Sequence, residues 1–295
     1  MQTCVIFNPS ARGEKAEALC ARLGAFYPGG ALRRTGAPGE ARRLAAQAVR
    51  EGFSTIIAAG GDGTANEVVN GMADVPQGLA VARLGILPLG TVNVFARELR
   101  LPRQLPAVVR VLAAGREMTM DLGCVEFGGG SDGQRRCFLQ LAGAGIDARA
   151  VQLVNWTLKK KTGPLAYVAA GFRALREMQP VIAVEGPHPM SGELVLVGNG
   201  RFYGGSFEFF PGASLRDGLL DVRVLPKISA RGVLQAALGL ATGRVSRFLP
   251  MRQFRSPTVS LRSSSRVGLQ LDGEYAGELP AAFSVLRQAV RVIVP

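Results

Sequence analysis

Short apolar runs alternate with amphipathic segments through the first third of the chain. The runs at 3–7 and 54–58 predict buried strands, and the segments at 11–25 and 38–50 carry apolar residues at helical spacing. Repeated strand–helix units with short links are typical of a parallel sheet covered by helices on both faces. We therefore expect residues 1–122 to form an α/β domain with three layers and a mostly parallel sheet.

Beyond residue 122 the pattern changes to short strands separated by frequent glycine and proline turns. Examples are the strands predicted at 137–141, 283–286 and 290–294. Dense short strands indicate an antiparallel sandwich or barrel, so residues 123–295 are predicted to be a β-rich sandwich domain. The sequence leaves open that the last strand returns to the N-terminal domain. We expect the active site in a cleft between the two domains, since ligands of parallel sheets bind at the carboxyl ends of the strands.

The run Gly60-Gly61-Asp62-Gly63-Thr64 follows a predicted strand and opens a predicted helix. Glycines let the backbone approach a ligand closely and adopt positive φ. The start of a helix offers free N–H groups and the positive end of the helix dipole. This arrangement predicts a phosphate site. Asp62 would repel phosphate, and a bridging Mg²⁺ would remove that conflict.

Two further turns carry polar side chains that suit phosphoryl chemistry. A second strand–turn–helix pattern contains Gly90, Thr91 and Asn93, where Thr91 could donate to phosphate and Asn93 could cap the helix or bind ligand. Later, Asp272 and Glu274 flank Gly273 after a predicted strand. This turn is either a simple Asp-Gly hairpin or the carrier of a general base that accepts a proton from a hydroxyl nucleophile.

The net charge of +13 favours anionic partners. Residues 159–161 are three consecutive lysines near Trp156, which suits either an anionic membrane surface or a solvated helix end. Aromatic residues make up only 6% of the chain and do not alternate with basic ones, so we expect no nucleic-acid partner.

The chain has four cysteines without the paired spacing of a zinc site, and we expect Cys4 and Cys124 to be buried free thiols. The single histidine, His188, lies between prolines and is expected to be solvated. No apolar run approaches the length of a membrane span, and the first residues read as a strand and turn rather than a signal peptide. We therefore expect a cytoplasmic protein that associates peripherally with the inner face of the membrane, as a monomer or a homodimer.

These motifs together resemble the lipid kinase family that includes diacylglycerol kinases, sphingosine kinases and their soluble bacterial relatives. The resemblance covers nearly the whole chain. It rests on the following segments in order: Asn8-Pro9-Ser10, Thr35 before Gly39-Glu40-Ala41, Gly60 to Thr64 with Asn66-Glu67, residues 88–97, 138–148, 199–205 and Asp217-Gly218-Leu219-Leu220-Asp221. The first glycine loop is shared with NAD kinases, but the later motifs favour the lipid branch.

The resemblance implies transfer of the γ-phosphate of ATP, with Mg²⁺, to a hydroxyl of a lipid such as diacylglycerol or a related glycero- or sphingolipid. It makes Glu274 the proton acceptor, with Asp272 supporting it. It implies a metal site at Asp217 with backbone carbonyls around Ser214 and Leu219. The implied nucleotide contacts are Asn8, Thr35, Gly60, Gly61, Asp62, Gly63, Thr64, Asn66, Glu67, Gly90, Thr91 and Asn93.

Two positions depart from the family pattern. Val94 stands where many members have an aspartate that joins an acidic, Mg²⁺-linked network with the residues matching Asp62 and Asp121. Gln140 replaces a more usual asparagine. Two alternatives stay open: a NAD kinase-like phosphotransferase, and a non-catalytic nucleotide- or lipid-binding member of the fold.

Overall fold

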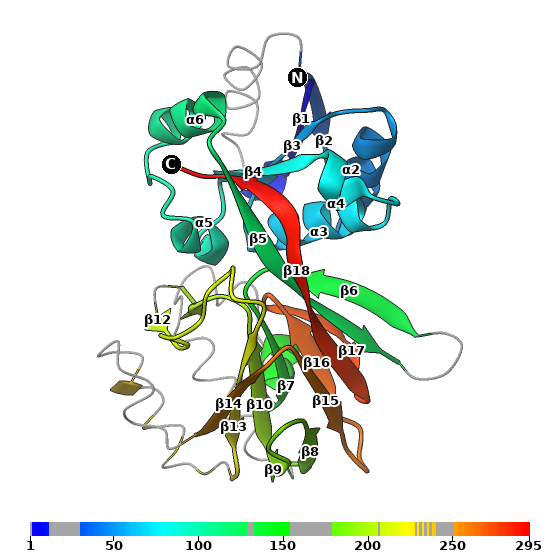
Figure 1. Cartoon of the computed structure of the whole chain (residues 1–295), viewed down its shortest axis with the longest axis vertical. Helices are drawn as coiled ribbons and strands as arrows, with labels where there is room; N and C mark the ends of the chain where they lie inside the picture. The colour runs from blue at the N-terminus through cyan, green and yellow to red at the C-terminus, as the bar shows by residue number, and fades with distance from the viewer. Residues whose placement is uncertain are drawn as a thin grey trace. The chain divides into compact units, whose positions relative to one another are not determined.

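The structure is a computed structural model that divides into two compact units (Figure 1). Unit 1 comprises Met1–Leu122 and Arg287–Pro295, and unit 2 comprises Gly123–Leu286. The chain passes between the units within two long strands, β5 and β18. The residues that the structure describes are 2–11, 30–128, 133–153, 179–205, 207–227, 229, 232, 235, 238, 239 and 251–295.

A parallel sheet with the strand order β2-β1-β3-β4-β18 forms the centre of unit 1. All six residues of β3 are buried, as expected for a central strand covered on both faces. The strands of this unit are β1 (Thr3–Phe7), β2 (Ala31–Arg34), β3 (Thr55–Gly60), β4 (Arg83–Pro88), the first part of β5 (Glu117–Phe127) and the last part of β18 (Ala281–Ile293).

Helices pack on both faces of this sheet. Val108 and Leu112 of α6 join one core with Phe7 and Ile57, while α2 and α3 lie together on the other face (Figure 1). A Cβ at Gly71 of α3 would lie 2.1 Å from a carbonyl oxygen of α2, so glycine permits this close packing. The helices are η1 (Pro9–Ala11), α2 (Glu40–Arg50), α3 (Asp62–Ala73), α4 (Gly78–Val81), α5 (Val94–Glu98) and α6 (Leu105–Ala114).

Unit 2 is an antiparallel β-sandwich. One sheet has the order β14-β13-β10-β7-β16-β17, and the other contains β18-β15-β8-β9 with the β5–β6 pair. Apolar residues of the two sheets, such as Phe138, Val197, Leu269 and Phe283, share one core. The elements confined to this unit are β6 (Gln134–Phe138), β7 (Leu141–Gly145), α7 (Ile146–Leu153), β8 (Ile182–Glu185), β9 (Met190–Gly192), β10 (Leu194–Gly198), β11 (Phe202–Tyr203), β12 (Phe207–Glu208), β13 (Leu220–Leu225), β14 (Arg252–Ser256), β15 (Thr258–Arg262), β16 (Gly268–Leu271) and β17 (Glu274–Glu278).

The predicted fold class is confirmed, but the bounds of three predicted strands are wrong. The run at 137–141 is divided between β6 and β7 by a turn at Leu139 and Gln140. The two strands predicted at 283–286 and 290–294 are one strand, β18. Gln288 has a φ of 46°, and its N–H donates to Asp121 Oδ1 at 2.7 Å. The polar interruption at 287–289 is therefore a kink within a continuous strand, not a turn.

None of the helices in the described part of the chain has the length and hydropathy needed to span a membrane.

The end of β18 contributes to the core of unit 1. Ile293 is fully buried against β4 and α6 residues such as Leu87 and Leu112. We predict that Ile293→Ala lowers the free energy of unfolding by about 2–5 kcal/mol, because it leaves a cavity in that core. Urea unfolding followed by circular dichroism measures the loss. Val81→Ala, at a side chain that is 53% exposed, serves as the control, and equal effects of the two substitutions would contradict the prediction.

Candidate functional site

The first glycine loop joins a buried strand to a helix in unit 1. β3 ends at Gly60, Gly61 occupies the N-cap position in an extended conformation, and α3 begins at Asp62. No side chain at the N-cap position caps α3. The first N–H groups of a helix lack partners within it and carry the positive end of its dipole. The start of α3 is therefore suited to bind a phosphate group.

The glycines of this loop serve close packing, and the expectation of positive φ is wrong for Gly61, whose φ is −91°. A Cβ at Gly60 would lie 2.3 Å from Thr64 Oγ1. A Cβ at Gly90 would lie 2.6 Å from Gly61 Cα. The N–H groups of Leu89 and Gly90 both donate to Gly60 O, at 2.8 and 3.2 Å. The two glycine turns therefore touch each other and form one continuous backbone surface.

Asp62 connects the two loops. Its carboxylate accepts hydrogen bonds from the N–H groups of Val94 and Phe95, both at 3.0 Å, at the start of α5. Asn93 occupies the N-cap position of α5 with a φ of 53°, but its side chain makes no capping bond. Instead the Asn93 amide accepts from Gly90 N at 3.0 Å and donates to Gly90 O at 2.6 Å. Of the two roles considered for Asn93, the helix cap is supplied by Asp62, and ligand binding stays a prediction.

Two other predicted nucleotide contacts, Asn8 and Thr35, lie where the strands of this sheet end. Asn8 follows β1, and its Nδ2 donates to Thr64 Oγ1 at 3.1 Å. The N–H of Asn8 donates to Ala59 O on β3, and the N–H of Thr35 donates to Phe7 O on β1, both at 2.9 Å. Neighbouring parallel strands bring these residues to the edge of the sheet where ligands bind.

The remaining predicted contacts of unit 1 have different surroundings. Both carboxylate oxygens of Glu67 accept main-chain N–H groups, from Gly39 and Ala41, each at 2.9 Å, so Glu67 caps the start of α2. Asn66 is buried, and its Oδ1 accepts from Asn70 Nδ2 at 3.1 Å. Thr91 is exposed in the second loop. For Glu67 the structure thus reveals a helix-capping role that the sequence did not predict.

The turn that carries Glu274 lies in unit 2. Asp272 and Gly273 have φ values of 49° and 88°, which is the pattern of a type I′ hairpin turn between β16 and β17. Leu271 pairs with Glu274 across the turn. Glu274 is partly exposed at the first position of β17. The turn is therefore a simple Asp-Gly hairpin, and this hairpin also carries the candidate general base, Glu274.

Asp272 anchors this hairpin to the turn between β6 and β7. Its carboxylate accepts the N–H groups of Leu139, Gln140 and Leu141, at 2.8, 2.9 and 3.1 Å. Three charge-assisted bonds from consecutive amides hold the carboxylate and the positive-φ backbone in one orientation. Asp272 therefore fixes the position from which Glu274 projects.

A buried polar group behind the hairpin was missed by the sequence interpretation. Gln270 Oε1 accepts from Gly273 N, and Gln270 Nε2 donates to Asp147 Oδ2, both at 2.7 Å. The hydroxyl of Tyr203 also donates to Asp147. Burial raises the pKa of the Asp147 carboxyl, and these two hydrogen bonds oppose that shift. No local sequence signal joins three residues this far apart in the chain.

The residues of the implied metal site lie between β12 and β13. Asp217 Oδ1 accepts from Leu219 N at 3.1 Å, its Oδ2 pairs with Arg255, and Ser214 Oγ accepts from Arg216 N at 3.3 Å. A guanidinium therefore neutralises the Asp217 carboxylate in this arrangement, and the metal site with backbone carbonyls around Ser214 and Leu219 stays a prediction. The described residues contain no group of three or more His, Cys, Asp or Glu side chains that could hold a metal ion.

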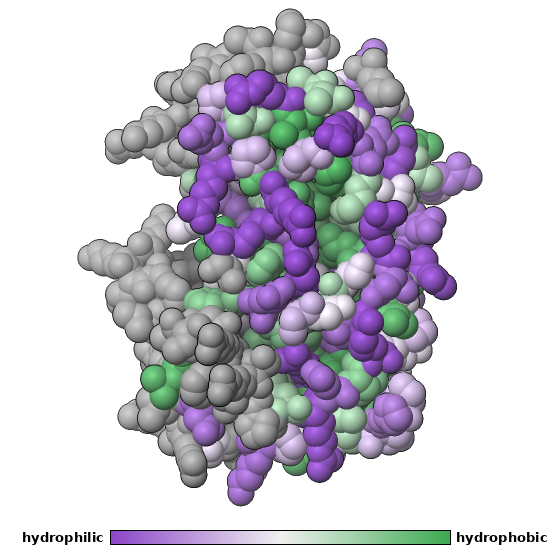
Figure 2. Space-filling view, turned by 60° about the vertical axis from the view of Figure 1, so that its left-hand side comes forward, coloured by the Kyte–Doolittle hydropathy of each residue, from purple (hydrophilic) through white to green (hydrophobic). Residues whose placement is uncertain are grey.

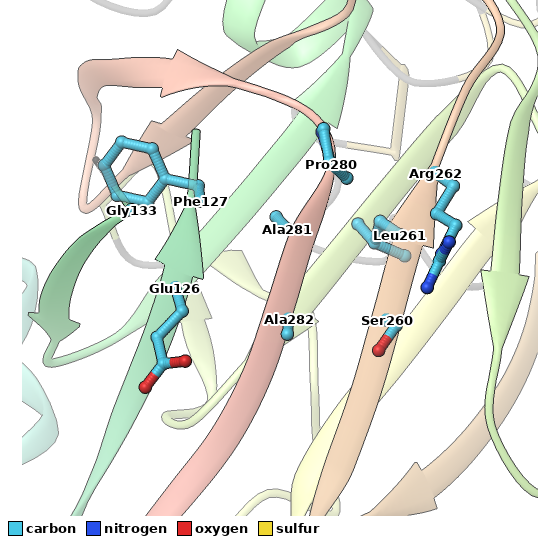
Figure 3. A pocket seen from close by; sticks show the side chains of 9 residues that line it. All are labelled: Glu126, Phe127, Gly133, Ser260, Leu261, Arg262, Pro280, Ala281 and Ala282. Carbon is cyan, nitrogen blue, oxygen red and sulfur yellow. The ribbon is translucent and has the colours of Figure 1, made fainter. Parts of the chain in front are cut away.

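A shallow pocket of about 240 Å³ lies among β5, β15 and β18 in unit 2 (Figure 3). Its wall is apolar at Leu261 and Ala281 and charged at Glu126 and Arg262. Neither Asp272 nor Glu274 lines it. The pocket is therefore separate from the proposed chemistry.

Two family models match successive parts of the chain. The diacylglycerol kinase catalytic domain matches residues 2–125, and the YegS C-terminal NAD kinase beta sandwich-like domain matches residues 140–294. The chain belongs to the diacylglycerol kinase family of lipid kinases.

Named relatives agree with this assignment to the lipid kinases. The chain is 34% identical over 273 residues to a Pseudomonas aeruginosa protein named "Probable lipid kinase YegS-like", with 90% of this chain and 84% of the relative covered. It is 31% identical over 261 residues to a diacylglycerol kinase of Staphylococcus saprophyticus, with coverages of 87% and 82%. Identity to the diacylglycerol kinase of Staphylococcus aureus strain Newman is 30% over 301 residues, with coverages of 99% and 91%.

Solved structures share the fold of this lipid kinase. Two from Bacillus anthracis str. Sterne, both described under the name diacylglycerol kinase, match with TM-scores of 0.80 and 0.71 at 20% and 18% identity. Each covers 100% of this chain, which covers 95% and 97% of them. The protein is an ATP-dependent lipid kinase, a phosphotransferase with an alcohol group as acceptor, as the sequence predicted.

The contacts of Glu67 predict a structural effect. Replacing Glu67 by alanine removes the carboxylate that caps α2, so we expect a loss of about 1–2 kcal/mol of stability and faster amide exchange at Gly39 and Ala41. Denaturant unfolding and hydrogen-exchange mass spectrometry measure both effects. Asp74→Ala, which breaks a surface pair with Arg42, is the control and should cost at most about 1 kcal/mol. Unchanged exchange at Gly39 and Ala41 would show that the cap is unimportant.

Proposed function

We propose that this lipid kinase transfers the γ-phosphate of ATP to the hydroxyl of diacylglycerol or a closely related glycerolipid. The observation that carries the proposal is the pair of touching glycine turns at the start of α3, in a chain matched by the diacylglycerol kinase catalytic model. The names of the staphylococcal relatives support the choice of acceptor.

The first half of the proposed site binds the nucleotide phosphates. The main-chain N–H groups of Asp62, Gly63 and Thr64 begin α3 and carry the positive end of its dipole. Asn8 and Thr35 lie beside this loop, and Thr91 lies in the adjoining one. Gly60, Gly61 and Gly90 keep side chains out of the surface, and Asn93 holds the second turn through its bonds to Gly90. Asn66 and Glu67, on the first turns of α3, stay predicted contacts.

We propose that Mg²⁺ enters this site with the nucleotide. Magnesium in kinases is usually held by one or two carboxylates together with substrate phosphates. Asp62 is the acid in the first turn of α3, and its carboxylate, which also accepts the N–H groups of Val94 and Phe95, would supply an oxygen ligand to such an ion. The ion would supply positive charge that offsets the repulsion between Asp62 and the phosphates and stabilises charge on the transferred group.

The second half of the proposal concerns the acceptor hydroxyl. Glu274 accepts the proton of the lipid hydroxyl while the hydroxyl oxygen bonds to the γ-phosphorus of ATP. At the same time, the bond between the γ-phosphorus and the oxygen that bridges it to the β-phosphorus breaks. Asp272 acts through Glu274, because its three bonds to Leu139, Gln140 and Leu141 fix the turn. A rigid turn keeps the carboxylate in one position and so reduces the entropy lost on reaching the transition state.

The metal site at Asp217, with Ser214 and Leu219, stays a prediction of the resemblance. Arg255 pairs with both Asp217 and Asp221 on neighbouring strands. We propose that its guanidinium supplies the positive charge that a cation would otherwise supply there.

We propose that the enzyme reaches its lipid by binding peripherally to an anionic membrane, as a cytoplasmic protein. The net charge of +13 supports electrostatic attraction. On the face shown in Figure 2, hydrophilic side chains are interleaved with smaller hydrophobic areas, which suits contact through charge rather than deep insertion. The basic run at 159–161 with Trp156 lies outside the described residues. The homodimer stays a prediction that light scattering can test.

The catalytic role of Glu274 gives a direct test. We predict that Glu274→Gln lowers kcat for diacylglycerol phosphorylation at least about 100-fold, because the amide cannot take the proton. The assay supplies labelled ATP, Mg²⁺ and a panel of diacylglycerol, phosphatidylglycerol, sphingosine and ceramide in mixed micelles, and counts label in the organic phase.

Glu278→Gln, at an exposed carboxylate on the same strand, is the matched control and should keep full activity. Near-normal turnover by folded Glu274→Gln protein would remove Glu274 from the mechanism. A parallel reaction with NAD in place of lipid covers the alternative: label transferred to NAD in the aqueous phase would favour a NAD kinase-like activity, and the absence of transfer in both reactions would favour a non-catalytic binding protein.

Membrane binding has a separate prediction. We expect the protein to co-sediment with vesicles containing phosphatidylglycerol at low salt and to be released as salt rises to about 1 M, where the Debye length falls to about 3 Å. Changing all three lysines at 159–161 to glutamine should weaken binding, while Lys227→Gln should not. Equal binding to vesicles of phosphatidylcholine alone would contradict an electrostatic mechanism.

A further inference from the structure

Two cysteines of unit 2 stand opposite each other on adjacent strands. Cys124 of β5 pairs directly with Cys137 of β6 in the antiparallel ladder. Residues opposed in this way have Cα atoms about 4.5 or 5.5 Å apart, depending on the type of pair. Both distances fall within the range of about 4.4–6.8 Å that disulfides span. The backbone therefore already has the spacing of a disulfide, although the two sulfur atoms are not joined in this structure.

The surroundings of the pair favour a reactive thiolate. Arg135 Nε donates to Cys124 Sγ at 3.1 Å. The hydrogen bond from Cys137 and the charge of Arg135 lower the pKa of Cys124 against the opposing effect of burial. The nucleophilic form of a cysteine is its thiolate, so Cys124 is the thiol expected to attack first and Cys137 the one placed to resolve the product.

The pair lies close to solvent although both side chains are buried. The side chain of Arg135, which contacts Cys124, is 57% exposed. Glu126 lies two residues beyond Cys124 and therefore on the same face of β5. It lines the open pocket in Figure 3. A small oxidant that enters beside Arg135 or Glu126 therefore needs only a local movement to reach Cys124.

We propose that Cys124 and Cys137 form a reversible thiol–disulfide pair that exchanges with small disulfides of the glutathione class. The Cys124 thiolate attacks one sulfur of the oxidant, forming a mixed disulfide and releasing one thiolate. Cys137 then attacks Cys124 Sγ, which forms the internal disulfide and releases the second thiolate. The protein loses two electrons and two protons, and the oxidant gains both as two thiols. Intracellular disulfides are typically transient and redox-sensing, which matches a reversible pair.

Cys4 provides an internal control for this inference. It is fully buried on β1, and the residues opposite it on the two neighbouring strands are Ala31 and Ile56. Burial raises the pKa of the Cys4 thiol to about 11. Cys4 therefore lacks both a partner across the ladder and the means to ionise, and it should stay reduced under the same conditions.

The experiment uses the full chain with Cys20→Ser, so that three thiols remain. The folded protein is incubated with glutathione disulfide, quenched in acid, denatured and alkylated with iodoacetamide. Intact mass and peptide mapping should show a bond between Cys124 and Cys137, with Cys4 alone alkylated. Dithiothreitol should restore three alkylated cysteines. Protein in which Cys124 and Cys137 stay fully alkylated, or in which Cys124 keeps a stable mixed disulfide, would overturn the proposal.

Two variants test the roles of the separate residues. Cys137→Ser should stop at the mixed disulfide on Cys124, because the resolving thiol is gone. Arg135→Gln should form the same internal disulfide several-fold more slowly. Circular dichroism checks that both variants are folded. Equal oxidation rates in the Arg135→Gln variant and the parent protein would overturn the role assigned to Arg135. Whether Cys124 and Cys137 form a disulfide at all is decided by the experiment on the Cys20→Ser protein.

Discussion

Carboxylates that accept main-chain N–H groups hold the functional loops of this kinase in place. Asp62 binds the start of α5, Glu67 binds the start of α2, and Asp272 binds three consecutive amides before β7. An N–H group that is buried without a partner costs about 1–3 kcal/mol, so each carboxylate strongly favours a single loop conformation. Because the partners are distant in sequence, these bonds also fix which elements are neighbours.

Local signals were sufficient to predict the elements that carry the site. The strand, the glycine turn and the helix at 54–70 follow from apolar pattern and turn chemistry, and so does the hairpin at Asp272 and Gly273. The change after residue 122 to short apolar runs separated by glycine and proline turns predicted the sandwich. The order of the motifs along the chain then predicted the family, which the family models confirm.

Contacts between residues that lie far apart in the chain could not be predicted from the sequence. Glu67 lies in a motif that suggested a ligand contact, but its caps on α2 depend on how α2 and α3 pack. The glycines suggested positive φ, but they are needed because the two turns touch at Gly61 and Gly90. This contact cannot be predicted without knowing that the two turns meet. The Asp147, Gln270 and Tyr203 group and the pairing of Cys124 with Cys137 likewise depend on strand register, which no local pattern reveals.

The final residues of the chain, Arg287–Pro295, belong to unit 1, and they add a parallel strand beside β4. During synthesis the ribosome completes the whole sandwich before it releases this last piece of the nucleotide-binding unit. Unit 2 is a continuous segment and is therefore able to fold first. Until Arg287–Pro295 are made, one edge of β4 in unit 1 has no neighbouring strand. The parallel sheet of the nucleotide-binding unit is therefore completed only after the residues of unit 2 have been made.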